Sequence, residues 1–253
     1  MRRRTLLATL AAASPWALGA GTYPGRAVRL VVPYSVGVGP DIVARSLAEP
    51  LGADWGQPVL VDNRPGGSGI VAFGEVRRTP PDGHTIFLAD TATLCVNPLL
   101  HRTLPYDPQH DLVPLTLLFH ATFVLWVGAG NRLRSVAELL QAARQAPGQV
   151  SYATLGNGHA SHVAVETLAD AAGVQLLAVP FKDAGTLMAA VASAQVNFTA
   201  FSVNTVAALY AAGRLRPLAV AARQRLAAQP QIPTLAEAGG PALTMHPWAG
   251  LVT

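Results

Sequence analysis

Two short loops combine glycines with small polar side chains, and each directly precedes a segment with helical spacing. The first loop, YSVGVGPD, covers residues 34–41, and the second, ATLGNGHASH, covers residues 153–162. The first turn of a helix leaves backbone N–H groups unpaired and carries a partial positive charge, so each loop suits a carboxylate or a phosphate. Four side chains add neutral donors: Ser35, Thr154, Asn157 and Ser161.

Each loop also fits a purely structural role, because glycine permits tight turns and Ser161 is a residue type that commonly caps a helix. One loop stands in each half of the chain, however, which favours a ligand held between two lobes. Neither loop contains an arginine. Binding is therefore expected to rest on backbone N–H groups and hydroxyls.

Patterns typical of enzymes are absent from the sequence. The stretch GVGPDI (37–42) lacks the third glycine of a dinucleotide-binding loop, and GK[ST], GxSxG and HExxH do not occur. Cys95 is the only cysteine; it cannot form an internal disulfide and is expected to be a buried apolar residue. We expect no enzyme activity, no cofactor and no metal. A secreted enzyme that uses His159 or His162 as a base is the alternative.

Strand-like and helix-like segments alternate along the chain, which indicates an α/β fold. Strands are expected at 27–34, 58–65 and 84–90 and then at 119–129, 150–155, 176–181, 197–203 and 216–222. Helices are expected at 41–56, 67–78 and 93–101 and then at 135–148, 161–173, 185–195 and 204–215. We predict two lobes with mostly parallel sheets flanked by helices: lobe 1 over 22–120, lobe 2 over 121–222, and a return to lobe 1 over 223–253.

The composition and the N-terminus suggest a folded, secreted protein. Hydrophobic residues make up 51% of the chain and charged residues 13%, which argues against disorder. The net charge is +4, but residues 2–4 supply three arginines and the other cations are scattered, so no nucleic-acid binding is expected. A cationic start, an apolar stretch and small residues predict a signal peptide over 1–21. Twin-arginine export and an uncleaved anchor are the alternatives to ordinary secretion.

A series of short motifs resembles the solute-binding receptors of tripartite tricarboxylate transporters, the Bug family. The motifs are YP (23–24), RLVVP (29–33), DIVAR (41–45), NRPG (63–66), PDGHT (81–85), NP (97–98), LPYDP (104–108), SVAEL (135–139), YA (152–153), GNG (156–158), SH (161–162), VPFK (179–182), IPT (232–234), AEAG (236–239) and WAGL (248–251). Each motif alone is weak, whereas the whole set in order over residues 23–253 is specific. The resemblance implies a two-lobe periplasmic binding protein that closes on a small organic acid and delivers it to permease subunits in the membrane. It also implies a monomer.

The resemblance further implies a set of ligand-binding residues. They are Tyr34, Ser35, Gly37, Gly39 and Asp41 in the first loop, Thr91 and Thr93 after the third strand, Thr154, Asn157, Gly158 and Ser161 in the second loop, and Phe181 and Lys182 at the next strand end. Lys182 is either a counter-charge for the ligand or a surface lysine paired with Asp183. The ligand itself is left open among di- and tricarboxylates, acidic amino acids and aromatic acids.

The sequence also departs from the family pattern. Val36, Val38 and Pro40 stand where smaller or hydroxylated residues are common, and Phe201 stands where the family often has an aspartate. The chain stops at residue 253, where the family continues into a stretch that completes the first lobe, so a C-terminal truncation with exposed apolar sheet surface is expected. The alternatives to a transport receptor are a secreted ligand sensor that signals to a membrane kinase and a truncated receptor without function.

Overall fold

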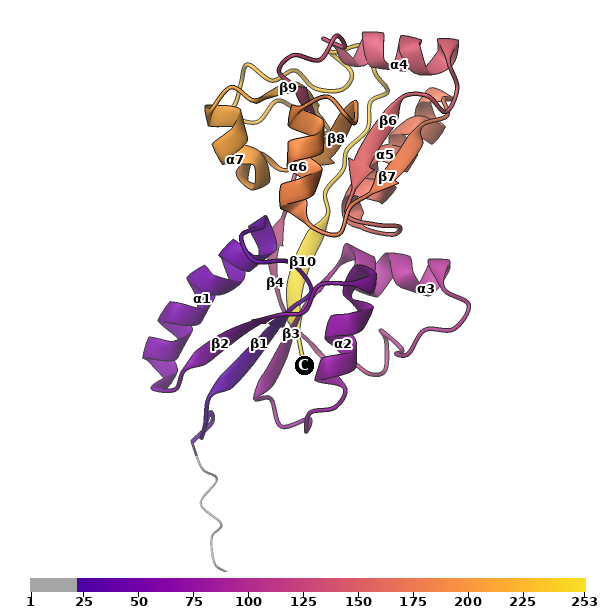
Figure 1. The fold of residues 1–253 in the computed structure, drawn as a ribbon. Coiled ribbons are helices and arrows are strands. Elements are labelled where there is room, and N and C mark those ends of the chain that lie inside the picture. Colours follow the sequence, from indigo (N-terminus) through magenta and orange to yellow (C-terminus); the bar gives the residue numbers. More distant parts are fainter. Residues whose placement is uncertain (1–21) are drawn as a thin grey trace, which may run out of the picture.

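The computed structural model describes residues 22–253, which form two lobes joined by two chain crossings (Figure 1). The signal peptide expected over residues 1–21 lies outside the described residues. Each lobe is built on a five-stranded sheet with helices packed against it. The predicted two-lobe α/β fold is confirmed.

The first lobe holds both the N-terminal half and the last strand. Its elements are β1 (Val28–Val32), α1 (Gly39–Trp55), β2 (Val59–Asn63), η1 (Gly67–Gly69), α2 (Ile70–Val76), β3 (Thr85–Asp90), η2 (Ala92–Val96), α3 (Asn97–Leu100), β4 (Pro114–His120) and β10 (Trp248–Val252). The strand order is β2-β1-β3-β10-β4. β1 pairs in parallel with β2 and β3, whereas β10 runs antiparallel to both β3 and β4.

The second lobe is formed by the middle of the chain. Its elements are β5 (Val124–Gly128), α4 (Val136–Gln145), β6 (Ser151–Thr154), α5 (Ala160–Ala172), β7 (Leu177–Pro180), α6 (Ala184–Ala192), β8 (Phe198–Phe201), α7 (Val203–Ala211) and β9 (Leu215–Val220). The strand order is β7-β6-β8-β5-β9. β6 pairs in parallel with β7 and β8, and β5 runs antiparallel to β8 and β9.

Both sheets are therefore mixed rather than mostly parallel. The strands that run against the others are β5 and β10, and each is the first strand after a crossing: β5 follows the crossing into the second lobe, and β10 follows the crossing back. Such strands enter a sheet from the other lobe without the helical crossover that makes neighbouring strands parallel. Apolar content alone does not reveal this difference, because β5 is as fully buried as a central parallel strand.

The crossings lie at residues 121–123 and 246–247. The single strand expected at 119–129 is in fact the end of β4 and the whole of β5, because an apolar run hides the point at which the chain changes lobe. The return expected at residue 223 occurs later. Leu235 packs in the second-lobe core, where its N–H donates to the Val220 carbonyl at 3.0 Å, and the N–H of Met245 donates to the Ala221 carbonyl at 2.9 Å.

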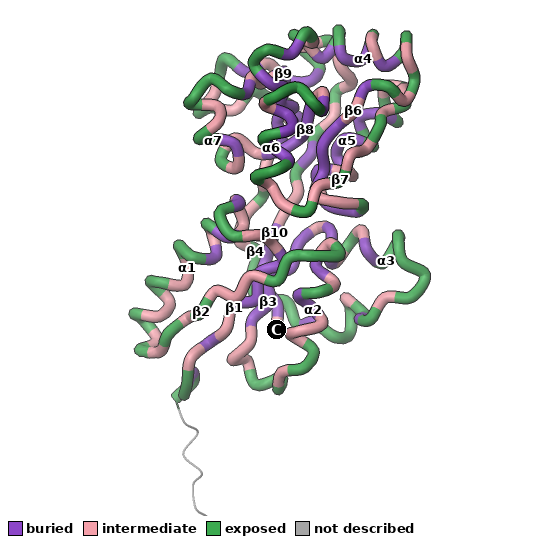
Figure 2. Tube along the Cα trace, viewed as in Figure 1, coloured by how far each residue is buried: buried purple, intermediate pink, exposed green. Residues whose placement is uncertain are grey.

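Buried residues concentrate in the strands and on the inner faces of the helices (Figure 2). Local signals set several helix ends: the Ser135 hydroxyl accepts the Glu138 N–H at 3.1 Å at the start of α4, and Gly56, with φ +63°, caps the C-terminus of α1. Cys95 is exposed, which corrects the expectation of a buried thiol. It lies in η2 two residues after the buried Thr93, and such neighbours on a helical turn point in different directions.

Candidate ligand-binding site

The two glycine loops meet across the gap between the lobes. The first loop follows β1 and the second follows β6, so both lie at carboxyl ends of parallel strands. The rings of Tyr34 and His159 approach edge to face with their centroids 6.0 Å apart. Near them, the Ser68 hydroxyl of the first lobe donates to the Asn157 carbonyl of the second lobe at 2.9 Å. The lobes are thus in direct contact at the predicted site.

Asp41 organises the first loop from inside. Its buried carboxylate accepts the Gly37 N–H at 2.8 Å and the Asn63 amide at 2.8 Å, and it pairs with Arg45 at 3.1 Å. Burial alone would raise the pKa of Asp41, but the hydrogen bonds from Arg45, Gly37 and Asn63 hold that pKa below its usual value. The carboxylate therefore holds the loop in shape and is fully occupied by protein groups.

The threonines after β3 also lie behind the binding surface. Thr93 is buried, its N–H donates to the Asp90 carboxylate at 2.8 Å, and its hydroxyl bonds to the same group. The Thr91 hydroxyl accepts the backbone N–H of Trp248 at 3.0 Å, and this bond connects the second crossing to the first lobe. Asp90 in turn accepts a hydrogen bond from the Tyr34 hydroxyl. Burial and the Asp90 charge raise the pKa of Tyr34, which stays protonated.

His159, rather than Ser161, caps helix α5. Its Nδ1 accepts the Ser161 N–H at 3.1 Å and lies 2.8 Å from the Ser161 hydroxyl, which also lies 3.0 Å from the Thr154 hydroxyl. Helix α5, expected to start at Ser161, begins at Ala160, because the ring nitrogen of His159 accepts the N–H that a capping oxygen usually accepts. Thr154 and Ser161 are both buried and support His159 from behind.

His159 is neutral and keeps one free donor. Burial lowers the pKa of His159 to about 4, with the Asp90 charge opposing the change and His162 adding to it. Because Nδ1 accepts the Ser161 N–H, the single ring proton lies on Nε2. Nε2 is buried and has no hydrogen-bond partner among the described residues. A buried N–H without a partner is rare and marks a place where a ligand acceptor fits.

One hollow, which we call the loop cleft, lies between the glycine loops. It has a volume of about 400 Å³ and is lined by Tyr34, Ser35, Ser68, His159, Phe181 and Lys182, together with residues 65–67 and two further side chains. Lys182 is exposed, and it is the only lysine in the sequence. Asp183 caps helix α6 instead of pairing with it, since its carboxylate accepts the Thr186 N–H at 2.8 Å. The described lining of the cleft contains no carboxylate.

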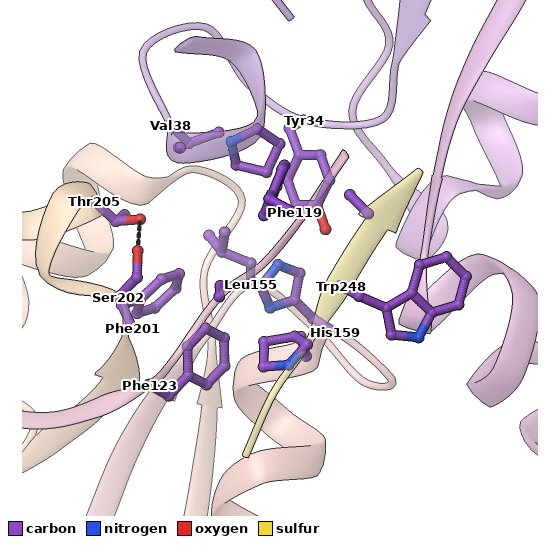
Figure 3. Close-up of a pocket in the computed structure, with 16 residues that line it drawn as sticks. Tyr34, Val38, Phe119, Phe123, Leu155, His159, Phe201, Ser202, Thr205 and Trp248 are labelled. Carbon is purple, nitrogen blue, oxygen red and sulfur yellow. Dashed lines mark hydrogen bonds between the residues drawn. The ribbon is translucent and has the colours of Figure 1, made fainter. Parts of the chain in front are cut away.

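A second hollow, which we call the aromatic cavity, adjoins the loop cleft (Figure 3). Its volume is about 70 Å³, and Phe119, Phe123, Phe201 and Trp248 supply most of its rings. Tyr34, Leu155 and His159 line both hollows. Figure 3 shows the His159 imidazole at the centre of this group, with Tyr34 directed toward it from the first lobe.

The residues implied by the resemblance thus fall into three groups. Tyr34, Ser35, Phe181 and Lys182 line the loop cleft, and Gly39 lines the aromatic cavity. Asn157 and Gly158 lie at the contact between the lobes. The remaining residues make hydrogen bonds within the protein that shape or support the loops: Gly37, Asp41, Thr91, Thr93, Thr154 and Ser161. Within residues 22–253 no group of three His, Cys, Asp or Glu side chains is placed to hold a metal ion.

Comparison with known proteins decides the family. The sequence model of the TctC family, described as the tripartite tricarboxylate transporter family receptor, matches residues 43–253. The chain belongs to this receptor family. The receptor is 35% identical to the "UPF0065 protein in tcbD-tcbE intergenic region" of Pseudomonas sp. (strain P51), an alignment that covers 98% of this chain and 75% of that protein. Members of the family are receptors, in agreement with the expectation that the chain is not an enzyme.

Solved structures share the receptor's fold. An R. palustris protein solved with adipate superimposes with a TM-score of 0.86 at 33% identity, covering 91% of this chain and 77% of that one. MatC from Rhodopseudomonas palustris, solved with bound malate, gives a TM-score of 0.84 at 27% identity, covering 91% and 79%. No helix in the described part of the receptor is long and apolar enough to cross a membrane.

Sequence reasoning missed several residues that line the site. In the sequence His159 suggests only a catalytic base, because histidine is not among the residue types that commonly cap helices. Phe119, Phe123 and Trp248 flank the two crossings, and in the sequence they cannot be told from core aromatics. Phe201 and Val38, which differ from the pattern that the resemblance implies, both line the aromatic cavity.

Proposed function

We propose that the receptor captures a small organic carboxylate in the periplasm and delivers it to the permease subunits of a tripartite tricarboxylate-type transporter. One observation carries this proposal: the loop cleft is lined from both lobes, contains the only lysine of the chain, and has no carboxylate in its described lining. A negatively charged ligand is attracted to such a cleft, whereas a cation finds no partner there. Two similar structures contain adipate and malate, both of them carboxylates.

Capture in this proposal works by closure of the lobes on the ligand. The crossings at 121–123 and 246–247 contain no helix or strand and can act as hinges. The contacts between Ser68 and Asn157 and between Tyr34 and His159 form only when the lobes are together. A ligand that touches both loops stabilises this closed arrangement, which is the form that a permease would recognise.

Secretion and partners belong to the same proposal. The N-terminal residues 1–21 would direct export and be removed, leaving a monomeric periplasmic protein. A strain that lacks the gene should take up the transported carboxylate more slowly than its parent, and the full-length gene should restore uptake. If the deletion strain takes up every tested carboxylate as fast as its parent, the proposed role in transport is contradicted.

Binding itself is tested by calorimetric titration of the purified protein with a panel of adipate, malate, citrate, glutamate and benzoate. The expected result is saturable binding of at least one member at one site, with the ligand recovered unchanged by NMR. Chemical conversion of the ligand, lost in His162→Ala, would instead support the secreted enzyme. Absence of binding by the whole panel would reject the carboxylate receptor.

A further inference from the structure

The aromatic cavity offers a ligand rings and hydrocarbon but no charge. Both lobes and both crossings contribute to its lining. Among these residues, all of which the structure describes, there is no Lys, Arg, Asp or Glu side chain. Of the three hydroxyls in the lining, those of Ser202 and Thr205 lie 3.0 Å apart and bond to each other (Figure 3), and that of Tyr34 donates to Asp90. An ionised group placed among these rings would lose its hydration and would meet no charged side chain.

Phe201 supplies one of the rings that give the cavity this character. It stands at the end of β8, its ring lies 6.1 Å from that of Phe123 and 6.0 Å from that of His159, and its carbonyl accepts the Trp126 indole N–H at 2.9 Å. Val38 and Pro40, at the N-terminus of α1, close the same cavity from the first lobe. Val38, Pro40 and Phe201 therefore meet around one hollow.

The size of the cavity limits what can enter. A single water needs about 10–15 Å³ of such space, so a cavity of about 70 Å³ accepts a group of several heavy atoms, such as one ring. The adjoining loop cleft has the room and the positive charge for a carboxylate. Between the two hollows stands His159, whose Nε2–H is buried and lacks a partner in the described structure.

Building on the proposed receptor function, we propose that the ligand is an aromatic monocarboxylate. Its ring occupies the aromatic cavity, its carboxylate lies in the loop cleft near Lys182, and the Nε2–H of His159 donates to a carboxylate oxygen. A linear dicarboxylate such as adipate fits less well, because its second charged end would enter the aromatic cavity.

Competitive calorimetric titrations of the full receptor test this proposal, with benzoate, phenylacetate, adipate and malate as probes. Benzoate or phenylacetate should bind roughly tenfold or more tightly than either dicarboxylate, since a desolvated charge is costly. Benzyl alcohol, which has the ring without the charge, should bind weakly. Tighter binding of adipate or malate would overturn the aromatic proposal while leaving the receptor function intact. Failure of every carboxylate to bind would overturn both.

Two substitutions test the aromatic cavity and the His159 donor independently. Phe201→Leu should weaken benzoate about threefold to tenfold while changing adipate little. Phe198→Leu is the matched control. Phe198 lies in the same strand, but it packs with Leu139 and Leu168 in the second-lobe core and does not line the aromatic cavity. His159→Leu should weaken both carboxylates by a similar factor, because it removes a hydrogen bond that any carboxylate accepts. An unchanged benzoate affinity in Phe201→Leu would contradict the contact between the ligand ring and the aromatic cavity. An unchanged benzoate affinity in His159→Leu would contradict the hydrogen bond from Nε2. Urea unfolding of each variant verifies that it is folded.

Discussion

The Ser68 hydroxyl in the first lobe donates a hydrogen bond to the Asn157 carbonyl in the second lobe, across 2.9 Å. Ser68 lies in η1 with φ +49°, a left-handed conformation that is unusual for a residue other than glycine. A conformation of this kind persists where surrounding contacts require it, and it is common at ligand-binding sites. The bond between the two residues fastens the lobes together beside the loop cleft.

Removal of this bond should favour the open form. In Ser68→Ala the closed state loses one hydrogen bond, worth about 0.5–1.5 kcal/mol, so carboxylate affinity should fall roughly threefold to tenfold. Small-angle X-ray scattering should show a larger radius of gyration for the ligand-free variant. Ser46→Ala is the control, because the Ser46 hydroxyl also donates to a carbonyl, that of Val43, but within α1. Equal behaviour of the two variants would mean that the Ser68 bond does not hold the lobes.

Gly158 tests how closely the lobes must approach. A Cβ at this position would lie 2.7 Å from Cδ1 of Leu100 in the other lobe, whereas a Cβ at Gly156 would meet nothing within 4 Å. Both glycines have positive φ, so alanine strains the backbone at either position. Gly158→Ala should therefore weaken ligand binding more than Gly156→Ala does.

Leu100 provides a suppressor for this effect. The double variant Gly158→Ala with Leu100→Ala removes the clash and should recover most of the lost affinity in the same titration. Because Leu100 is exposed, its truncation should cost little stability. Persistence of the full defect in the double variant would assign it to the strained backbone instead of the contact between lobes.

His159 makes folding stability depend on pH. Its pKa is about 4 in the folded receptor and about 6.5 when unfolded, so between these values the unfolded chain binds a proton that the folded one does not. The free energy of unfolding should then fall by about 1.4 kcal/mol for each unit that the pH is lowered through this window. Urea unfolding of His159→Gln between pH 7 and 5 should lack this component. His101→Gln, at an exposed position, serves as the control, and identical pH profiles for all three proteins would refute the buried neutral histidine.

Asp41 is expected to matter for stability more than for ligand contact. Asp41→Asn weakens the hydrogen bonds to Arg45 and Gly37 and should lower the free energy of unfolding by about 1–3 kcal/mol. The folded variant should still bind carboxylate with nearly wild-type affinity. Asp54→Asn, an exposed change in the same helix, should alter neither property. Loss of binding with unchanged stability would make Asp41 a ligand contact.

The glycine loops show what a sequence can and cannot reveal. Glycine favours tight turns, so the sequence predicts the turns at Gly37, Gly156 and Gly158, each of which has a positive φ. The partner of each polar group could not, because Asp41 and Thr93 are satisfied by residues that only the fold brings near. The free donor of His159 arises in the same way, from a cap that no propensity scale would favour.

The fold shows the same limit at a larger scale. Alternating strands and helices indicate two lobes, but the directions of β5 and β10 are set by the crossings that precede them and not by that alternation. Phe119, Phe123 and Trp248 gather around the aromatic cavity only because those crossings lie side by side. Sequence spacing carries no information on that proximity.

Lys182 offers the most direct test of the central claim, that a carboxylate binds between the lobes. Reductive methylation with ¹³C-formaldehyde labels this single lysine and the N-terminal amine, so one lysine signal reports on the loop cleft. Titration with benzoate should shift the Lys182 signal until it saturates at one ligand per chain, at the same concentration at which calorimetry shows saturation. Heat of binding without any change in the Lys182 signal would place the ligand elsewhere and contradict the account.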